Sequence, residues 1–332
     1  MRIDGKRVLV TGGAGFIGSN LVDALLDRDC FVRAVDDFSV GSEDNLIEAR
    51  ERGAEIVRAD VRDVDAMREA AADVEVVMHL AVSCLRVSLL DPWPSHSVNA
   101  GGTLALLEAV KDVGLERFVY CSSSEIYGTA KTAPMAEDHP TEPTTVYGAS
   151  KLAGEGYALS YVATGGLPVV VARPFNTYGY REHHEGPSGE VIPKMVLRAR
   201  GAEPPVIFGD GSQTRDFTFV TDTVRGLILA TEAEDLVGEA INIAYGREVS
   251  ISRIAELVCE AVDRTLEPVY TSPRPADVQR HYADVTKARK RLGFEAEISI
   301  EEGIERYVEW FRERYHDVGA LLAADVERNW EQ

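Results

Sequence analysis

Tyr147 and Lys151 are four positions apart in the segment YGASK. On a helix this spacing puts a phenol and an ammonium on one face, one turn from each other. The ammonium favours the phenolate, so we expect the pKa of the tyrosine to lie below its ordinary value of about 10. Such a tyrosine can act as a general base. Because the same spacing occurs by chance in many helices, the pair needs support from other motifs.

A glycine-rich segment, TGGAGFIG from Thr11 to Gly18, follows the first predicted strand and opens the first predicted helix. Gly12, Gly15 and Gly18 permit a tight turn, a close approach of bare backbone to a pyrophosphate, and packing of the helix on the strand. The helix N-terminus supplies N–H donors and the positive end of a dipole. With a strand before it and a helix after it, the segment predicts a dinucleotide site.

Residues at later strand ends complete the predicted cofactor site. Asp36 ends the second strand, where a carboxylate accepts hydrogen bonds from ribose hydroxyls and repels a 2′-phosphate. This favours NAD over NADP. The positive nicotinamide ring would add to Lys151 in favouring a Tyr147 phenolate. Further predicted NAD contacts are Phe16 and Ile17 in the glycine segment, Asp60 and Val61 facing the adenine, and Leu80 and Ala81 after the fourth strand.

The elements that must position these residues alternate along the chain. Six short Val-rich runs, RVLVTG, FVRAVD, AEIVRAD, VEVVMHLA, RFVYCSS and LPVVVARP, are typical of strands buried on both faces of a parallel sheet. Helical patterns over residues 15–28, 94–113 and 145–164 lie between them, which is the order that builds βαβ units. The predicted fold is therefore α/β, a Rossmann-type doubly wound parallel sheet with a smaller C-terminal substrate-binding lobe.

The regular alternation of predicted strands and helices ends after about Phe175, at the Gly/Pro/His-rich loop NTYGYREHHEGPSGE. We expect residues 1–175 to form the NAD-binding domain that carries the catalytic residues. Residues 176–332 are expected to form mainly the substrate lobe. Two later segments, VIFGDG and AINIAYG, are expected to return to the main sheet.

Composition and charge exclude several other classes of protein. No apolar run reaches the roughly 20 residues of a membrane-spanning helix, and no signal peptide is evident, so we expect a cytoplasmic protein. A formal charge of −20 would repel nucleic acid and anionic membranes. Four dispersed cysteines without a C-x-x-C pair indicate no disulfide framework. His183 and His184 lack a third ligand at suitable spacing, so no metal site is predicted.

Together these motifs resemble the extended short-chain dehydrogenase/reductase family, in particular its nucleotide-sugar epimerases and dehydratases of the UDP-glucose 4-epimerase type. The resemblance runs from Arg7 to about Phe311. It includes GGAGFIG, the strand end at Asp36, HLA, SSSEIYG, YGASK, RPFNTYG, QTRDFTFV and RPAD. It implies a tightly bound NAD, a nucleotide-sugar substrate, and a homodimer formed through the helices at 94–113 and 145–164.

Several site residues are assigned by this resemblance alone. Ser123 is expected to hydrogen-bond both Tyr147 and the reacting hydroxyl of the sugar. Asn99 is placed with the NAD-binding set, where it orders the active-site helix and a water. The remaining substrate contacts that the resemblance implies are Ser124 beside the sugar, Asn176 and Arg215 at the diphosphate, and Arg274 and Asp277 near the nucleoside.

Glu125, two residues after Ser123, leaves the reaction open. In the epimerase scheme, Tyr147 takes the proton of the sugar 4-hydroxyl while C4 passes a hydride to NAD, and the 4-keto sugar receives the hydride on its other face. By resemblance, 4,6-dehydratases carry Thr-Asp-Glu or Thr-Ser-Glu here, and sugar-nucleotide decarboxylases carry Ser-Glu. Once C4 is a ketone, Glu125 could remove the C5 proton as a catalytic base. Ser124, however, is no proton donor comparable to an Asp.

We therefore favour a UDP-sugar 4-epimerase. The alternatives are an NDP-sugar 4,6-dehydratase, a UDP-glucuronate decarboxylase, and a catalytically silent sugar-nucleotide-binding protein. Substrate choice is expected to lie in the loop YGYREHHEGPSGEVIP and around residues 280–281. Arg86 and Arg181 could bind the carboxylate of a uronic acid, but the sequence does not place either side chain.

Overall fold

The six Val-rich runs form the first six strands of one parallel sheet. The computed structural model describes residues 1–184, 186–274, 278–328 and 330. A seventh strand from the C-terminal half, β11, joins the sheet beside β6, and the strand order is β11-β6-β5-β4-β1-β2-β3. This order confirms the predicted Rossmann-type doubly wound sheet. The strands are β1 (Arg7–Thr11), β2 (Phe31–Asp36), β3 (Glu55–Arg58), β4 (Val76–His79), β5 (Arg117–Cys121), β6 (Val169–Pro174) and β11 (Ala240–Ile243).

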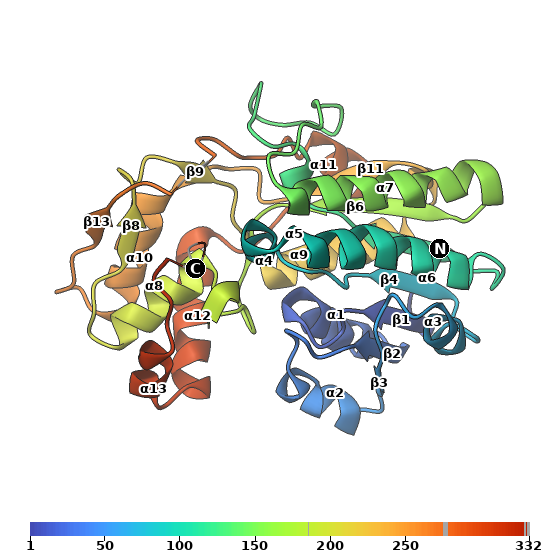
Figure 1. Ribbon diagram of the computed structural model, residues 1–332, viewed down its shortest axis with the longest axis horizontal. Coiled ribbons are helices and arrows are strands. Elements are labelled where there is room, and N and C mark those ends of the chain that lie inside the picture. The colour runs from blue at the N-terminus through green and yellow to red at the C-terminus, as the bar shows by residue number, and fades with distance from the viewer. Residues whose placement is uncertain (185, 275–277, 329, 331–332) are drawn as a thin grey trace.

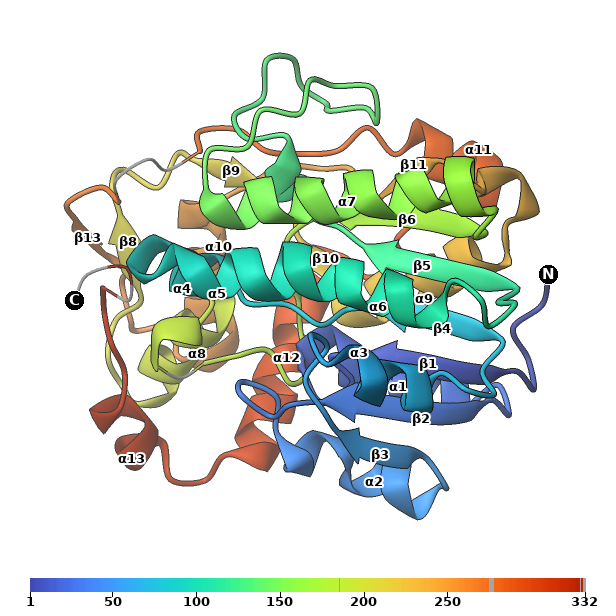
Figure 2. The ribbon, with the colours of Figure 1, turned by 45° about the vertical axis from the view of Figure 1, so that its right-hand side comes forward.

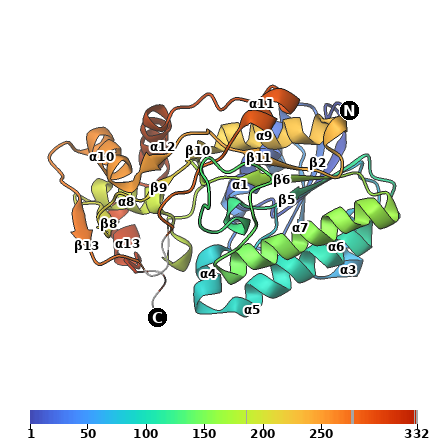
Figure 3. The ribbon, with the colours of Figure 1, turned by 90° about the horizontal axis from the view of Figure 1, so that it is seen from above.

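Helices cover both faces of this sheet (Figure 3). On one face α1 (Phe16–Leu26) packs beside α9 (Val220–Glu232), and on the other α3 (Val64–Ala70), α6 (Thr103–Val110) and α7 (Val146–Gly165) lie side by side. Buried aliphatic side chains fill both interfaces, as expected for strands without a solvent face. The short helix α2 (Ile47–Glu51) follows β2. This packing fixes the carboxyl ends of β1, β2, β4 and β5, where the candidate site lies.

The helix predicted over residues 94–113 is interrupted. After α4 (Leu85–Leu90) and α5 (Pro92–Ser95), the chain continues as a π-helical segment, His96–Gly102, before α6 begins. π-helical turns are rare in proteins, and those that do occur are often found at functional sites. Here the segment holds Asn99, which is buried and turned toward α7.

The smaller lobe lies beside the carboxyl edge of the sheet (Figures 1 and 2). VIFGDG does not return to the main sheet as predicted, because β8 (Val206–Phe208) pairs with β13 (Val269–Thr271) in a separate parallel ladder. AINIAYG does return, as β11. Two further short ladders join β7 (Thr177–Tyr178) to β10 (Thr218–Phe219) and β9 (Thr214–Arg215) to β12 (Val249–Ser250). Besides α9, the C-terminal half contains the α-helices α8 (Val191–Arg200), α10 (Ile251–Val262), α11 (Thr286–Leu292), α12 (Ile300–Arg314) and α13 (Val318–Ala323).

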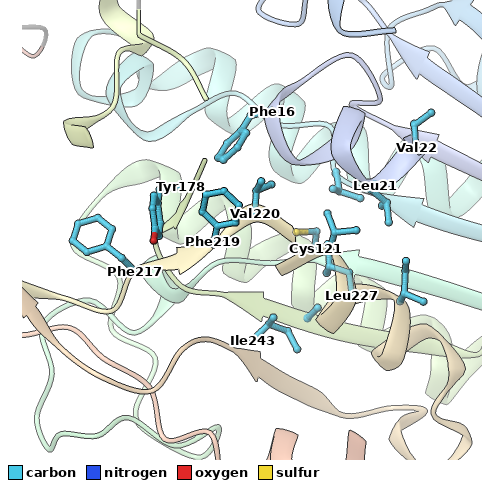
Figure 4. Packing of buried hydrophobic residues seen from close by; sticks show 14 of the residues in the cluster. Phe16, Leu21, Val22, Cys121, Tyr178, Phe217, Phe219, Val220, Leu227 and Ile243 are labelled. Carbon is cyan, nitrogen blue, oxygen red and sulfur yellow. The ribbon is translucent and has the colours of Figure 1, made fainter. Parts of the chain in front are cut away.

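An aromatic cluster joins the smaller lobe to the start of α1 (Figure 4). The Tyr178 ring packs edge-on against Phe219, with ring centroids 5.3 Å apart, and against Phe217 at 6.1 Å. Phe16 belongs to the same buried cluster. Because Phe16 begins the helix that follows the glycine segment, this packing fixes one wall of the cleft relative to the other.

No helix in the described part of the chain is long and apolar enough to cross a membrane.

Candidate active site

A cleft of about 980 Å³ runs along the carboxyl edge of the sheet and under the smaller lobe. It gathers almost all of the predicted site residues. Asn99 is the exception among the described residues, because it is buried outside the cleft. Asp277 lies outside the described residues. The predicted residues that line the cleft are Gly12, Gly15, Phe16, Ile17, Gly18, Asp36, Asp60, Val61, Leu80, Ala81, Ser123, Ser124, Glu125, Tyr147, Lys151, Asn176, Arg215 and Arg274.

The glycine segment forms a cradle that larger residues could not make. Gly12 has a φ of +70°, and a Cβ there would lie 2.7 Å from the backbone nitrogen of Ala81. A Cβ on Gly18 would lie 2.0 Å from the carbonyl oxygen of Gly12. Gly15 caps the N-terminus of α1 and faces the cleft. The backbone N–H groups at this end can therefore approach a pyrophosphate closely.

Asp36 stands beside this cradle with its carboxylate already ordered. Its two oxygens accept hydrogen bonds from the backbone N–H groups of Ala14 and Phe38, each at 2.9 Å. Burial raises the pKa of Asp36, and these two hydrogen bonds act in the opposite direction. The remaining lone pairs of such a carboxylate can accept ribose hydroxyls, while its charge repels a phosphate. The residues present fit a dinucleotide with an unphosphorylated ribose.

The part of the cleft predicted to face the adenine, at Asp60 and Val61, is less polar than the sequence indicates. The Asp60 carboxylate pairs with the Arg62 guanidinium (2.9 Å from Nε to Oδ1), which lowers the pKa of Asp60. Val61 packs beneath Gly102, where an added Cβ would meet it at 2.6 Å. The wall therefore presents a neutralised ion pair and an apolar side chain, which suits the edge and face of a base.

Ser123 and Tyr147 meet at the centre of the cleft. The Ser123 hydroxyl, just beyond β5, hydrogen-bonds the Tyr147 phenol and so lowers its pKa, but burial of the phenol has the larger effect. The pKa of Tyr147 is raised above its ordinary value, whereas the sequence predicted a lowered one. That prediction counted the nearby ammonium and omitted the hydration that an enclosed phenolate loses. The Glu125 carboxylate, which also lines the cleft, raises the pKa further.

Lys151 is buried one turn along α7 from Tyr147. Its ammonium lies 4.8 Å from the centroid of the Tyr120 ring, and its carbonyl oxygen accepts a hydrogen bond from the Tyr120 hydroxyl at 3.0 Å. Burial lowers the pKa of Lys151 to about 8. No carboxylate lies within ion-pair distance of it among the residues that the structure describes. A cation held over a ring face without a counter-ion is available to a phenolate and a ribose.

Asn99 holds the catalytic helix in place from outside the cleft. Its amide nitrogen donates to the Ser83 carbonyl and to the Ser150 hydroxyl, both at 3.0 Å, and its amide oxygen accepts the Ser83 N–H at 2.8 Å. Ser150 lies between Tyr147 and Lys151 and donates to the Tyr147 carbonyl. Asn99 is thus a positioning residue that joins the loop after β4 to α7, which agrees with the helix-ordering role expected from the sequence. It was grouped with the NAD-binding residues, but its side chain does not line the cleft.

His79 is also structural. Its two ring nitrogens hydrogen-bond with the hydroxyls of Thr11 (2.7 Å) and Thr103 (2.9 Å), and burial lowers its pKa to about 3. It therefore stays neutral and links the end of β1 to α6.

The predicted diphosphate and nucleoside residues lie at the far end of the cleft. Asn176 donates to the Asp216 carbonyl at 3.2 Å, and Arg215 donates to the carbonyl oxygens of Thr214 and Val278. The Arg274 guanidinium lies 5.9 Å from the centroid of the Trp330 ring. These contacts orient the polar side chains at the cleft wall.

Two cations in this region were missed by the sequence analysis. Lys194 and Arg198 project from α8 into the cleft, where Lys194 pairs with Asp325 at 3.1 Å. Trp330 also lines the cleft and stacks edge-on against Phe208 at 4.6 Å. The amphipathic pattern of α8 could have indicated the cations. Nothing in the polar C-terminal segment indicates that it folds back onto the cleft.

The arginines and histidines that the sequence left unplaced separate into two groups. Arg86 and His183 line the cleft. Arg181 instead pairs with Asp23 of α1 at 2.6 Å, and His184 packs between aromatic rings of the smaller lobe. Among the described residues, no group of three or more His, Cys, Asp or Glu side chains is arranged to hold a metal ion.

Of the two residues at 280–281, His281 contacts the backbone of Ser124, just after β5. The buried His281 ring lies with Nε2 3.3 Å from the Ser124 carbonyl oxygen and packs against Phe175, with ring centroids 5.1 Å apart. Arg280 is exposed and pairs with Glu248 at 2.6 Å. Neither residue lines the cleft.

Comparison with known proteins agrees with this arrangement. Residues 8–244 match the model of the NAD-dependent epimerase/dehydratase family. A UDP-glucose 4-epimerase from Mycolicibacterium smegmatis is 37% identical over 314 residues, which cover 93% of this chain and 99% of that one. The solved structure of an epimerase from Methanothermobacter thermautotrophicus has a TM-score of 0.91 at 36% identity and covers 96% of this chain and 95% of its own.

A further solved structure is that of a UDP-glucuronic acid 4-epimerase from Bacillus cereus. It has a TM-score of 0.86 at 31% identity and covers 93% of this chain and 100% of its own. The family resemblance drawn from the motifs is thereby confirmed. The chain is an NAD-dependent enzyme and belongs to the NAD-dependent epimerase/dehydratase family.

Proposed function

We propose that the enzyme is a UDP-sugar 4-epimerase that works through a transient 4-keto sugar. The observation that carries this proposal is the arrangement around Tyr147. Ser123 hydrogen-bonds its phenol, and Glu125 is the one carboxylate among the groups that most affect its pKa. The adjacent Ser124 is a buried hydroxyl. The site thus has what oxidation at C4 requires, and the residue beside Glu125 is a serine hydroxyl where a 4,6-dehydratase would use an acid to expel the 6-hydroxyl.

The residues divide the work of that oxidation. Tyr147 takes the proton of the 4-hydroxyl, while Ser123 holds that hydroxyl and Lys151 stabilises the phenolate. NAD held by the glycine segment and Asp36 would supply the acceptor, and later the donor, of the C4 hydride. When the keto sugar has turned its other face to the cofactor, Tyr147 gives the proton back to the oxygen. Bonds broken in the first half are remade in the second, so no net oxidation occurs.

A UDP-sugar suits the charges at the far end of the cleft. The chain carries a formal charge of −20, yet Arg215 and Arg274 line this region. Lys194 and Arg198 also line it, in ion pairs with Asp325 and Glu203. Guanidinium groups bind phosphate oxygens in a fixed, often bidentate geometry. Local cations can therefore hold two phosphates against the field of the whole protein. The relatives named for UDP-sugars support this substrate.

A 4,6-dehydratase is the second candidate, because Glu125 lines the cleft close enough to Tyr147 to raise its pKa. A carboxylate there could remove the C5 proton of a 4-keto sugar. The experiment is to incubate the enzyme with UDP-glucose, UDP-GlcNAc, UDP-glucuronate and dTDP-glucose and to follow mass and proton NMR. Unchanged mass with inversion at C4 supports epimerisation. Loss of water indicates a dehydratase, and loss of carbon dioxide indicates a decarboxylase.

Glu125→Gln sharpens this test. We expect the variant to keep most of its epimerase activity, because the scheme gives Glu125 no proton to move. In a dehydratase the same change should abolish turnover, since the C5 base is lost. An epimerase inactivated by Glu125→Gln, yet with unchanged NAD content and melting temperature, would contradict the scheme.

We also propose that the enzyme is a homodimer built on α6 and α7. These helices lie side by side on the outer face of the sheet (Figure 3). Leu104 on α6 is 39% exposed and Tyr157 on α7 is 37% exposed, so each leaves apolar surface uncovered. Sedimentation velocity should give a dimer, and Leu104→Glu should shift it toward monomer. A monomer at micromolar wild-type concentrations would refute the proposal.

A further inference from the structure

One wall of the cleft carries ionisable side chains that the proposed reaction does not use. Arg86 comes from α4, and Glu182, His183 and Glu190 come from the segment between β7 and α8. All four line the cleft. Figure 2 shows α4 above α8, and the segment that carries Glu182, His183 and Glu190 leads directly into α8.

Arg86 and Glu190 form an ion pair within this group. Nη2 of Arg86 donates to Oε1 of Glu190, and their side chains are 14% and 34% exposed. Burial lowers the pKa of Arg86, but the charge and hydrogen bond of Glu190, together with smaller effects of neighbouring groups, leave the pKa above its ordinary value. Glu190 is fixed by its backbone, since its N–H donates to the His183 carbonyl and its carbonyl accepts the Lys194 N–H. The ion pair is therefore held in place.

The other two members of the group add no cation to this wall. Burial, followed by the proximity of Glu190, raises the pKa of Glu182 well above its usual range, and its carboxyl accepts the Gly179 N–H at 3.0 Å. Burial lowers the pKa of His183, which favours its neutral form. The guanidinium of Arg86 therefore faces at least one carboxylate, that of Glu190, and no second cation from this group.

This wall lies toward the reacting end of the cleft. Cys84, two residues before Arg86, lines the cleft close to both Arg86 and Tyr147, and α4 contacts α7. Because C4 of the sugar must lie at Tyr147, the substituents of the same ring are the groups that reach the wall. The nucleotide extends the other way, toward Arg215 and Arg274.

We propose that the Arg86–Glu190 pair selects UDP-sugars with an uncharged hexosyl group and excludes uronates. The inference rests on the proposed function and adds the class of sugar, which the family leaves open because its members are named for both UDP-glucose and UDP-glucuronic acid. Glu190 already neutralises Arg86, so a uronate carboxylate would gain no free cation. It would meet the Glu190 carboxylate as a like charge in a desolvated place. Sugar hydroxyls can instead donate to Glu190 and accept from Arg86.

The test compares kcat/KM of the wild-type holoenzyme for UDP-glucose and UDP-glucuronate. We expect a preference for UDP-glucose of at least about tenfold, carried mainly by a higher KM for the uronate. Glu190→Gln leaves Arg86 uncompensated, and should lower the KM for UDP-glucuronate about tenfold while changing that for UDP-glucose much less. Asp23→Asn is the matched control, because it breaks the Arg181–Asp23 pair outside the cleft and should leave selectivity unchanged.

Equal or better use of UDP-glucuronate by the wild-type enzyme would overturn the inference and leave the proposed function standing. So would a Glu190→Gln variant that folds with unchanged selectivity. If neither of these sugars nor UDP-GlcNAc is epimerised, the proposed function fails. Competition binding of the two sugars to wild-type protein loaded with NAD then still tests the wall: tighter binding of UDP-glucose supports it, and equal or tighter binding of UDP-glucuronate refutes it. The same measurement serves if Glu190→Gln does not fold.

Discussion

Two groups of ionisable side chains line the same cleft and differ in whether a buried cation has a carboxylate partner. Around Tyr147, the Lys151 ammonium is buried with an aromatic ring beneath it, and burial lowers its pKa to about 8. Around Arg86, a buried guanidinium is matched by Glu190 and keeps a raised pKa. The first group leaves a cation uncompensated, and the second cancels one.

The difference follows from what each group has to do. A phenolate that forms during a reaction needs a positive charge that is not already committed to another anion. A surface that recognises hydroxyls needs donors and acceptors without a net field, because a net field attracts ions in place of neutral groups. Changes to each side of the cleft should therefore have different signatures, the first in kcat and pH dependence and the second in KM.

Removal of the proton acceptor should have the largest effect. Tyr147→Phe is expected to lower kcat about 10³-fold, because general-base catalysis contributes about 10² to 10⁴. NAD content and the binding of UDP-sugar should stay close to wild type. Tyr157→Phe, exposed on the same helix, is the control. Steady-state kinetics check this, and a loss below tenfold would show that another group takes the proton.

Lys151 offers a pH signature that the Arg86 pair should not show. Since burial lowers the pKa of Lys151 to about 8, its ammonium is present below that pH and lost above it. We expect kcat to fall on the alkaline side of about pH 8. Lys151→Met should lower kcat about 10²-fold by removing the charge. Lys151→Arg should keep residual activity without the alkaline decline, because an arginine stays protonated. A decline retained in Lys151→Arg would assign it to a different group.

Replacement of Asn99 should affect Tyr147 and Lys151 only by changing the position of α7. Asn99→Ala leaves the N–H and carbonyl of Ser83 and the Ser150 hydroxyl without their partner. We expect the free energy of unfolding to fall by about 2 kcal/mol, as buried polar groups lose hydrogen bonds. The kcat should fall about tenfold with little change in KM. Urea unfolding and kinetics measure both, and a KM effect as large as the kcat effect would indicate direct contact with substrate.

Salt should have the smallest effect and should act outside both groups. The chain has 55 acidic residues against seven lysines and 28 arginines, a balance that fits either a GC-rich genome or a high-salt cytosol. Screening of the surface charge by molar KCl is expected to raise the melting temperature by roughly 5 °C. The preference between UDP-glucose and UDP-glucuronate should change little, because the Arg86 pair is shielded. An unchanged melting temperature would argue against salt adaptation.

Much of the cofactor side could be predicted from sequence because its determinants are local. The strand before TGGAGFIG and the helix after it, the strand end at Asp36, and the helical spacing of Tyr147 and Lys151 each depend on a few neighbouring residues. The steric demand at Gly18 is local in the same sense, since an added Cβ clashes with the backbone of Gly12 in the same motif, whereas the demand at Gly12 comes from Ala81 after the adjacent strand. Features that depend on such short-range patterns can be predicted without knowledge of the rest of the fold.

The chain of 332 residues thus determined by itself its doubly wound sheet, the tight turn of its glycine segment and the placing of Tyr147 and Lys151 one turn apart on α7. Only the tertiary structure decided that VIFGDG pairs outside the main sheet, that burial raises the pKa of Tyr147, and that Arg86 meets a carboxylate 104 residues away. The physical reason is range. Spacing fixes which side chains share a face, whereas hydration and charge compensation depend on every segment that closes over a side chain, and distant segments meet only when the whole chain has folded.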